Sequence, residues 1–248
     1  MIEVRNLHKS FGANKILDGV SLRIENGESA AIIGRSGGGK SVLLKHLVGL
    51  LQPDAGEILI DGENIGPMNE RKLLRVRKKF GMVFQGAALF DSMTVAENVA
   101  FAFRNHQHLT AGEIAKRVAA ALEMVDLPGT ENKKPAELSG GMRKRVGLAR
   151  AIIYEPQIVL YDEPTTGLDP IVSDSIDKLM IRVRDHLKVT SIVVTHDMRS
   201  ARRVGNRVLM LHEKRIYASA APEDFFTSAD PVVRQFVDGI ADEKECLI

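Results

Sequence analysis

The stretch GRSGGGKS, residues 34–41, predicts the architecture of this chain. It matches the glycine-rich phosphate-binding pattern, in which a strand leads into a loop and the loop opens a helix. A short apolar run at 29–33 is the expected strand, and residues 41–51 are the expected helix. Backbone N–H groups of such a loop surround a phosphate, and the helix N-terminus adds positive potential. We therefore expect a nucleotide site in an α/β domain.

Within this loop, two side chains have predicted roles at the phosphates. Lys40 is expected to reach the β- and γ-phosphates, and Ser41 to supply a hydroxyl ligand to Mg²⁺. A glycine-rich turn without a ligand is the alternative, but the strand and helix on either side favour nucleotide binding.

Three further strand ends carry polar side chains. The apolar run 158–161 ends in Asp162, which can hold Mg²⁺, and Glu163, which can take a proton from an attacking water. The run 191–194 leads to His196, which would face the same phosphates. Gln85 follows the expected strand 80–84, and its side chain could contact Mg²⁺ or the water. The carboxylates could instead simply end a strand, and a lone histidine there is more often structural.

Strand-like and helix-like runs alternate along the chain, which indicates an α/β fold with a mostly parallel sheet. Residues from about 86 to 155 do not follow this alternation, and their pattern predicts a helical insert within the α/β core. Thr110 and Glu113 form a capping box at the start of one helix. A second helix is expected over 142–154, and short strands over 207–217.

Composition limits the possible functions. The 248 residues carry a net charge of only +2, which does not argue for a nucleic-acid partner. The basic run 71–79 lacks interleaved aromatic residues that could stack on bases. We therefore favour a solvated helix face over a surface that binds nucleic acid or anionic lipid headgroups. Cys246 is the only cysteine, so no intramolecular disulfide can form. No run approaches the roughly 20 apolar residues that cross a bilayer, so we do not expect this chain to form a pore.

A second glycine-rich segment, Leu138-Ser139-Gly140-Gly141, lies between the phosphate loop and Asp162. Ser139 can cap a helix that begins near Met142, and a capped helix N-terminus favours anions. With this segment, the order of motifs resembles the nucleotide-binding subunit of ABC transporters over nearly the full chain. The matching positions are Phe11, 34–41, Gln85, 138–142, Asp162-Glu163, 167–169 and His196.

The resemblance implies a P-loop NTPase domain with a RecA-like core, an antiparallel β subdomain and a helical subdomain. The core would comprise about 1–85 and 156–220, the helical subdomain about 86–155, and a tail about 221–248. It also implies an ATPase that uses ATP and Mg²⁺, with Ser41, Gln85 and Asp162 at the metal and Glu163, His196 and Gln85 in catalysis. Nucleotide-binding residues would be Phe11 on the adenine, then Gly34, Arg35, Ser36, Gly37, Gly38, Gly39, Lys40, Ser41 and Val42.

The family works as a pair of ATPase subunits, so the resemblance also implies contacts across a dimer. Ser139, Gly140, Gly141 and Asp169 would contact the ATP held by a second copy. Two departures stand out: Met142 occupies a position where the family most often has Gln, and Val42 one where it often has Thr. Neither replaced group is required for the chemistry above, so we expect activity.

This chain resembles the ATPases of MCE-associated, Mla-type lipid transporters at three places in its sequence: the segment 86–99, the tail 231–242 and Met142. That group implies a membrane permease, an MCE-domain subunit and often a STAS-domain subunit. The cargo would be phospholipid, which this chain itself would not bind. The chain would lie peripherally on the cytoplasmic face of a bacterial inner membrane. The alternatives are the ATPase of another ABC importer or exporter, or a soluble ABC scaffold or assembly ATPase.

Overall fold

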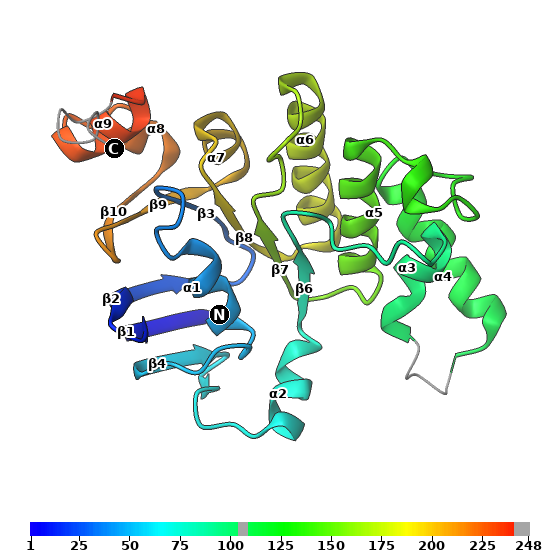
Figure 1. Cartoon of the computed structure of the whole chain (residues 1–248), viewed down its shortest axis with the longest axis horizontal. Helices are drawn as coiled ribbons and strands as arrows, with labels where there is room; N and C mark the ends of the chain where they lie inside the picture. The colour runs from blue at the N-terminus through cyan, green and yellow to red at the C-terminus, as the bar shows by residue number, and fades with distance from the viewer. Residues whose placement is uncertain (104–108, 241–248) are drawn as a thin grey trace.

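Two β-sheets organise the structure, a computed structural model that describes residues 1–103 and 109–240 (Figure 1). Cys246 and the last residues of the predicted tail lie outside the described residues. The smaller sheet is antiparallel and has the order β2-β1-β4-β5. Its strands are β1 (Ile2–Phe11), β2 (Asn14–Ile24), β4 (Ala55–Ile60) and β5 (Glu63–Asn64).

The larger sheet has six strands in the order β10-β9-β3-β8-β7-β6. All neighbours in it pair in parallel except β9 and β10, which are antiparallel. The strands are β3 (Ser29–Ile33), β6 (Phe80–Val83), β7 (Ile158–Asp162), β8 (Thr190–Thr195), β9 (Arg207–His212) and β10 (Arg215–Ala220). The predicted α/β class with an antiparallel part is therefore confirmed.

Every residue of β3, β7 and β8 is buried, as expected for parallel strands covered on both faces. Because the three strands are adjacent and parallel, their carboxyl ends meet at one edge of the sheet. Gly34, Glu163 and His196 follow these ends in the sequence. The sheet therefore brings together three motifs that are far apart along the chain.

Helix α1 (Lys40–Leu47) lies between the two sheets, as Figure 1 shows. Leu43, Leu44 and Leu47 are fully buried in a core cluster that includes side chains from both sheets. Burying each such leucine contributes about 1.5–3 kcal/mol. The helix ends at Leu47, before the predicted end at 51, and Gly49 then adopts a left-handed φ of 65°. The phosphate loop is thus attached to a helix that the hydrophobic core holds in place.

The helical region packs beside β6 and consists of α3 (Val95–Ala100), α4 (Ala111–Met124) and α5 (Gly140–Ile152). The predicted capping box of Thr110 and Glu113 is present at α4. Ser139 caps α5 as predicted, although the helix starts two residues before Met142. Helix α5 approaches β6 so closely that a Cβ on Gly81 would lie 2.2 Å from the Ala151 carbonyl oxygen. Only glycine fits there, so α5 is tied to the sheet as well as to α3 and α4.

The remaining helices surround the large sheet or follow it in the chain. Short 3₁₀ turns occupy Phe101–Phe103 and Pro135–Glu137. Among the described residues, none of the helices is both long enough and apolar enough to cross a bilayer. The helices not yet named are α2 (Glu70–Arg77), α6 (Pro170–Leu187), α7 (Met198–Val204), α8 (Pro222–Phe226) and α9 (Pro231–Asp238).

Candidate nucleotide-binding site

A cavity of about 360 Å³ opens at the edge where β3, β7 and β8 end. It collects most of the residues that the sequence assigned to ATP, although they come from six separate parts of the chain. Phe11 is 49% exposed at its rim and is therefore not an ordinary core phenylalanine, and the Lys9 ammonium lies 5.6 Å from the centre of its ring. The lining residues are Phe11, Ile16, Ser36, Gly37, Gly38, Gly39, Lys40, Ser41, Val42, Gln85, Glu163 and His196.

Lys40 is held at the centre of the phosphate loop. Its ammonium donates hydrogen bonds to the carbonyl oxygens of Gly34 at 2.7 Å and Arg35 at 2.9 Å. Its Nζ also lies 3.7 Å from Oε1 of Glu163. Burial lowers the pKa of Lys40, while the Glu163 carboxylate opposes that shift. The loop therefore presents a buried cation to the place where phosphates would bind.

Backbone conformation explains the glycines of this loop. Gly37 and Gly39 have φ values of 73° and 98°, in the left-handed region that disfavours other residues. A Cβ on Gly38 would lie 2.9 Å from the carbonyl oxygen of Arg35. The loop can curl tightly only because these three positions lack side chains.

Ser41 and Asp162 lie in direct contact, with the serine Oγ donating to Oδ1 of the aspartate at 2.8 Å. Asp162 is 8% exposed at the end of β7. A hydroxyl and a carboxylate next to a phosphate loop are the oxygen ligands that Mg²⁺ uses together with water and phosphates. No cluster of three or more His, Cys, Asp or Glu side chains exists among the described residues, so an all-protein metal cage is not the kind of site found here. The donor set fits a Mg²⁺ ion that comes with ATP.

Glu163 is buried and oriented by several neighbours. Its φ is 49°, an unusual value for a residue with a side chain, and its N–H donates to the Val194 carbonyl of β8 at 2.9 Å. Oε2 accepts a hydrogen bond from the Thr166 hydroxyl at 3.1 Å and lies 2.8 Å from Nδ1 of His196. The structure thus joins the predicted base to the predicted histidine, which are 33 residues apart.

Not every predicted residue lines this cavity. Gly34 and Arg35 face a neighbouring cavity of about 380 Å³, which His196 borders as well and which α9 closes. Among the residues that the structure describes, five more predicted ones are not part of the lining of the 360 Å³ cavity: Asp162, which contacts Ser41, and Ser139, Gly140, Gly141 and Asp169. Gly141 packs against α6, since a Cβ on it would lie 2.7 Å from Cγ1 of Val172, and a Cβ on Gly140 would lie 3.4 Å from Leu168, just before that helix. This placement leaves their predicted contact with a second copy's ATP as a prediction.

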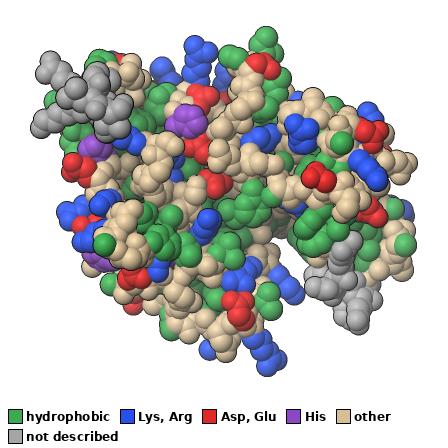
Figure 2. Space-filling model, viewed as in Figure 1, with side chains coloured by type: hydrophobic (Ala, Val, Ile, Leu, Met, Phe, Trp, Pro, Cys, Tyr) green, Lys and Arg blue, Asp and Glu red, His purple; other side chains and the backbone are tan. Residues whose placement is uncertain are grey.

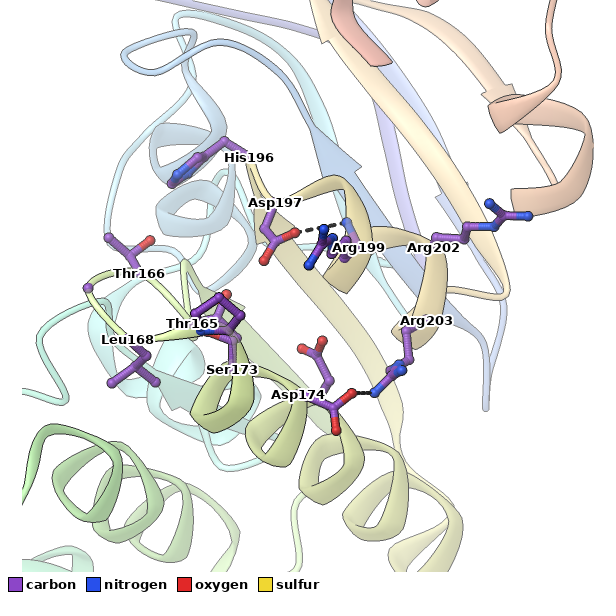
Figure 3. A pocket seen from close by; sticks show the side chains of 13 residues that line it. Thr165, Thr166, Leu168, Ser173, Asp174, His196, Asp197, Arg199, Arg202 and Arg203 are labelled. Carbon is purple, nitrogen blue, oxygen red and sulfur yellow. Dashed lines mark hydrogen bonds and ion pairs between the residues drawn. The ribbon is translucent and has the colours of Figure 1, made fainter. Parts of the chain in front are cut away.

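A larger cavity of about 810 Å³ lies between α6 and α7 and meets the nucleotide site at His196 (Figure 3). Arg203 pairs with Asp174 on one wall, and the backbone N–H of Arg199 donates a hydrogen bond to Oδ1 of Asp197 at 2.8 Å. Asp177, which sequence reasoning missed, lines it and is 4% exposed. Burial raises the pKa of Asp177 to about 6, against the hydrogen bond from Ser200. This cavity has neither the phosphate loop nor its lysine, so we assign nucleotide binding to the smaller one.

Sequence reasoning also missed Thr166 and Lys144. Thr166 follows the strand end by only a few residues, but no pattern distinguished it from other threonines. Lys144 carried a signal that could have been used, because it lies on the same face of its helix as Gly141 and Leu148. A lysine on a buried helix face requires partners inside the protein.

The basic run 71–79 forms α2, and Figure 2 shows Lys and Arg side chains along that edge of the molecule. Leu73 and Val76 are buried, so this helix packs against the core, whereas Leu74, also expected to pack, is 56% exposed. Arg75 and Arg77 pair with Glu63 and Glu70 at 2.6 and 2.8 Å. These contacts favour a solvated face, and the absence of a nucleic-acid partner stays a prediction.

The family match and the individual relatives of this chain all point to the same protein family. Residues 17–166 match the family described as ABC transporter. The "Probable ribonucleotide transport ATP-binding protein mkl" of Mycobacterium leprae is 44% identical over 96% of this chain and 69% of its own length. The "Intermembrane phospholipid transport system ATP-binding protein MlaF" of Escherichia coli is 41% identical over 98% of this chain and 90% of its own length.

A solved structure agrees with these sequence relatives. The dimeric ATP-binding cassette MJ0796 bound to ADP and phosphate matches with a TM-score of 0.81 and 33% identity, over 90% of this chain and 99% of that chain. The fold and the phosphate loop define an ATP-hydrolysing cassette. The chain belongs to the ABC transporter family, and it is an ATPase subunit that powers a transporter.

Proposed function

We propose that this ATPase powers the movement of phospholipid between the inner and outer membranes of a bacterium. The observation that carries the proposal is the similarity to MlaF, which extends over 98% of this chain and 90% of that protein. That protein is named for intermembrane phospholipid transport. The mycobacterial relative is named for ribonucleotide transport, so ribonucleotide is the second candidate cargo.

In this proposal the chain works with a membrane permease, an MCE-domain subunit and a STAS-domain subunit. It lies peripherally on the cytoplasmic face of the inner membrane and does not bind the lipid itself. The similarity to MlaF supports this division of labour, because that protein is named as the ATP-binding protein of a larger transport system.

Two copies would enclose two ATP molecules. One copy would hold each ATP with the phosphate loop, and the other would present Ser139, Gly140, Gly141 and Asp169. Ser139 caps α5 through a hydrogen bond from the Met142 N–H at 3.2 Å, so the positive end of this helix is available to an anion. The related cassette MJ0796 is dimeric with ADP and phosphate, which supports the same arrangement here.

Within each site we assign the chemistry to six side chains. Lys40 would bind the β- and γ-phosphates, and Ser41, Asp162 and Gln85 would hold Mg²⁺, which would neutralise charge on the phosphates. Glu163 orients the attacking water and accepts its proton on a carboxylate oxygen, a role worth about 10²–10⁴ in rate. His196 lies 2.8 Å from Glu163 and would face the γ-phosphate. Loss of the γ-phosphate then weakens the dimer, and the permease follows that motion.

The test begins with the complex as it occurs in membranes. The chain is purified with its partners in mild detergent, and the partners are identified by mass spectrometry. We expect a permease and an MCE-domain protein, with phospholipid in the extract. A different permease would keep the ATPase but discard the cargo, whereas a chain without membrane partners would favour a scaffold or assembly ATPase.

The cargo is then tested by reconstituting the recovered complex in vesicles. Complexes with the wild-type chain should move a fluorescent phospholipid in an ATP-dependent manner. The matched control carries Glu163→Gln and should move it at least about tenfold more slowly, because only hydrolysis is removed. ATP-dependent uptake of a radiolabelled ribonucleotide, without lipid movement, would contradict the phospholipid assignment.

A further inference from the structure

Lys144 is a buried cation that neither the phosphate loop nor the strand-end motifs include. It lies on α5 and is 7% exposed. Of the lysines that the structure describes, Lys40 and Lys144 are the two that are buried. Burying an ammonium group is costly unless strong acceptors surround it. The position of Lys144 therefore calls for a role at the site it faces.

Two carbonyl groups accept hydrogen bonds from the Lys144 ammonium. One belongs to Gln85, just after β6, and the other to Glu163, just after β7, at 3.4 Å. Strands β6 and β7 are parallel neighbours in the sheet. Lys144 thus connects the ends of two strands that carry a predicted metal contact and the predicted base.

The Glu163 backbone is held from two sides. Its N–H is fixed by the Val194 carbonyl of β8, and its carbonyl by Lys144. A φ of 49° at a non-glycine residue persists only where the surroundings impose it. Since the backbone conformation determines where the side chain projects, Lys144 contributes to the placement of the Glu163 carboxylate.

The segment after Gln85 is fixed to the same helix. Arg150, two turns further along α5, donates to the carbonyls of Ala87 and Ala88 at 2.6 Å each. Both alanines also have left-handed φ values, of 60° and 48°. Arg150 secures the far end of this segment, and Lys144 secures the Gln85 end and is the one that reaches Glu163 as well.

The electrostatic surroundings agree with a charged Lys144. Burial lowers its pKa, and the carboxylates of Glu163 and Asp162 oppose this shift. Both of the residues that accept its hydrogen bonds do so through neutral carbonyls, so the carboxylate of Glu163 stays free for His196, Thr166 and Lys40.

We propose that Lys144 is a positioning residue that fixes Gln85 and Glu163 relative to each other and so aligns the base with the attacking water. The inference rests on the roles proposed above for Gln85 and Glu163. As a consequence, Lys144 contributes to turnover and not to ATP affinity. Its ammonium contacts the backbone carbonyls of Gln85 and Glu163, and among the described residues it is not one of those that line the nucleotide cavity.

The experiment compares Lys144→Met and Lys144→Arg with the wild-type full-length chain. Met keeps the length of the apolar stem and removes the charge, and Arg restores a cation. We expect Lys144→Met to lower kcat at least about tenfold, while its affinity for mant-ATP, a fluorescent ATP analogue, changes less than about threefold. Lys144→Arg should recover most of the lost kcat. The control is Lys116→Met, an exposed lysine on α4, which should match wild type.

A second comparison separates positioning from general destabilisation. If Lys144 acts through Glu163, Lys144→Met should lower phosphate release much less in a Glu163→Gln background than in the wild-type background. An equal decrease in both backgrounds would overturn the inference. So would a kcat within twofold of wild type, or a tenfold loss of mant-ATP affinity. If Lys144→Met does not fold, Lys144→Gln replaces it with the same expected results.

The failure of this inference can be told apart from the failure of the proposed function. Wild-type turnover by Glu163→Gln alone would remove the base assignment, and the inference with it. An inactive Glu163→Gln together with a fully active Lys144→Met would remove only the role of Lys144.

Discussion

The nucleotide cavity and the cavity between α6 and α7 both contain a buried carboxylate, but among the described residues only the one in the nucleotide cavity, Glu163, has a cation in contact with it. Glu163 is 8% exposed, and Lys40 lies 3.7 Å from its carboxylate. Asp177 is 4% exposed and receives one hydroxyl hydrogen bond, from Ser200 at 2.9 Å. Its other oxygen, Oδ1, is buried without a hydrogen-bond partner among the described residues.

The two cavities differ in the partners that surround their buried carboxylates. At the nucleotide site, cations and hydroxyls meet carboxylates in a geometry that suits a phosphate and its metal. At Asp177, burial raises the pKa to about 6, so the ionised form is disfavoured and no compensating cation is in contact. A buried acid is therefore not by itself evidence of a catalytic site; its partners decide what it can do.

The largest effect is expected from Lys40→Ala, which removes the cation from the nucleotide cavity. Truncating one member of a buried charge pair costs about 2–5 kcal/mol, so ATP affinity should fall by about a hundredfold or more, and turnover with it. Mant-ATP titration measures this loss. Lys45→Ala changes an exposed lysine on the same helix and should bind normally. Unchanged affinity in Lys40→Ala would remove the phosphate role of Lys40.

Glu163→Gln should separate binding from hydrolysis. Glutamine keeps the hydrogen-bonding capacity toward Thr166 and His196 but cannot take a proton, so kcat should fall about a hundredfold while ATP stays bound. The trapped ATP should also hold the chain as a dimer, which size-exclusion chromatography with light scattering detects. Glu155→Gln is the control, since Glu155 is exposed and has a similar φ of 52°. Normal turnover in Glu163→Gln would contradict the assignment of the base.

The smallest effect is expected at Asp177. Its folded-state pKa of about 6 lies above the ordinary value of 3.8, so the folded protein binds the extra proton between these values. Stability therefore decreases as pH rises from about 4 to 6, and the full cost remains at neutral pH. Asp177→Asn should stabilise the protein by about 1–3 kcal/mol at pH 7 and by almost nothing below pH 4.

Chemical denaturation of both proteins at pH 4 and pH 7 measures this difference. ATPase activity should be retained, because Asp177 lies outside the nucleotide cavity. A mutant that is less stable than wild type at pH 7 would show that the ionised Asp177 has a stabilising partner.

The order of motifs was enough to predict the fold class and to name most of the residues that line the 360 Å³ cavity. Phosphate binding by a strand–loop–helix depends on backbone N–H groups and glycine conformations, and both are encoded within residues 34–41. The helix starts at Thr110 and Ser139 were also predictable, because capping depends on residues that are neighbours in the sequence. The domain boundaries near 85, 155 and 220 and the contacts with a second copy stay predictions.

Other features depended on the tertiary structure, because they arise where distant segments meet. The contact of Glu163 with His196, the burial of Lys144 next to two strand ends, and the isolation of Asp177 all depend on which strands and helices are neighbours. The sequence by itself determined the local chemistry of each motif, since that chemistry requires only a few consecutive residues. The parallel sheet and α5 decided which of these groups face one another, because hydrogen bonds and desolvation act over a few ångströms in space whatever the separation along the chain.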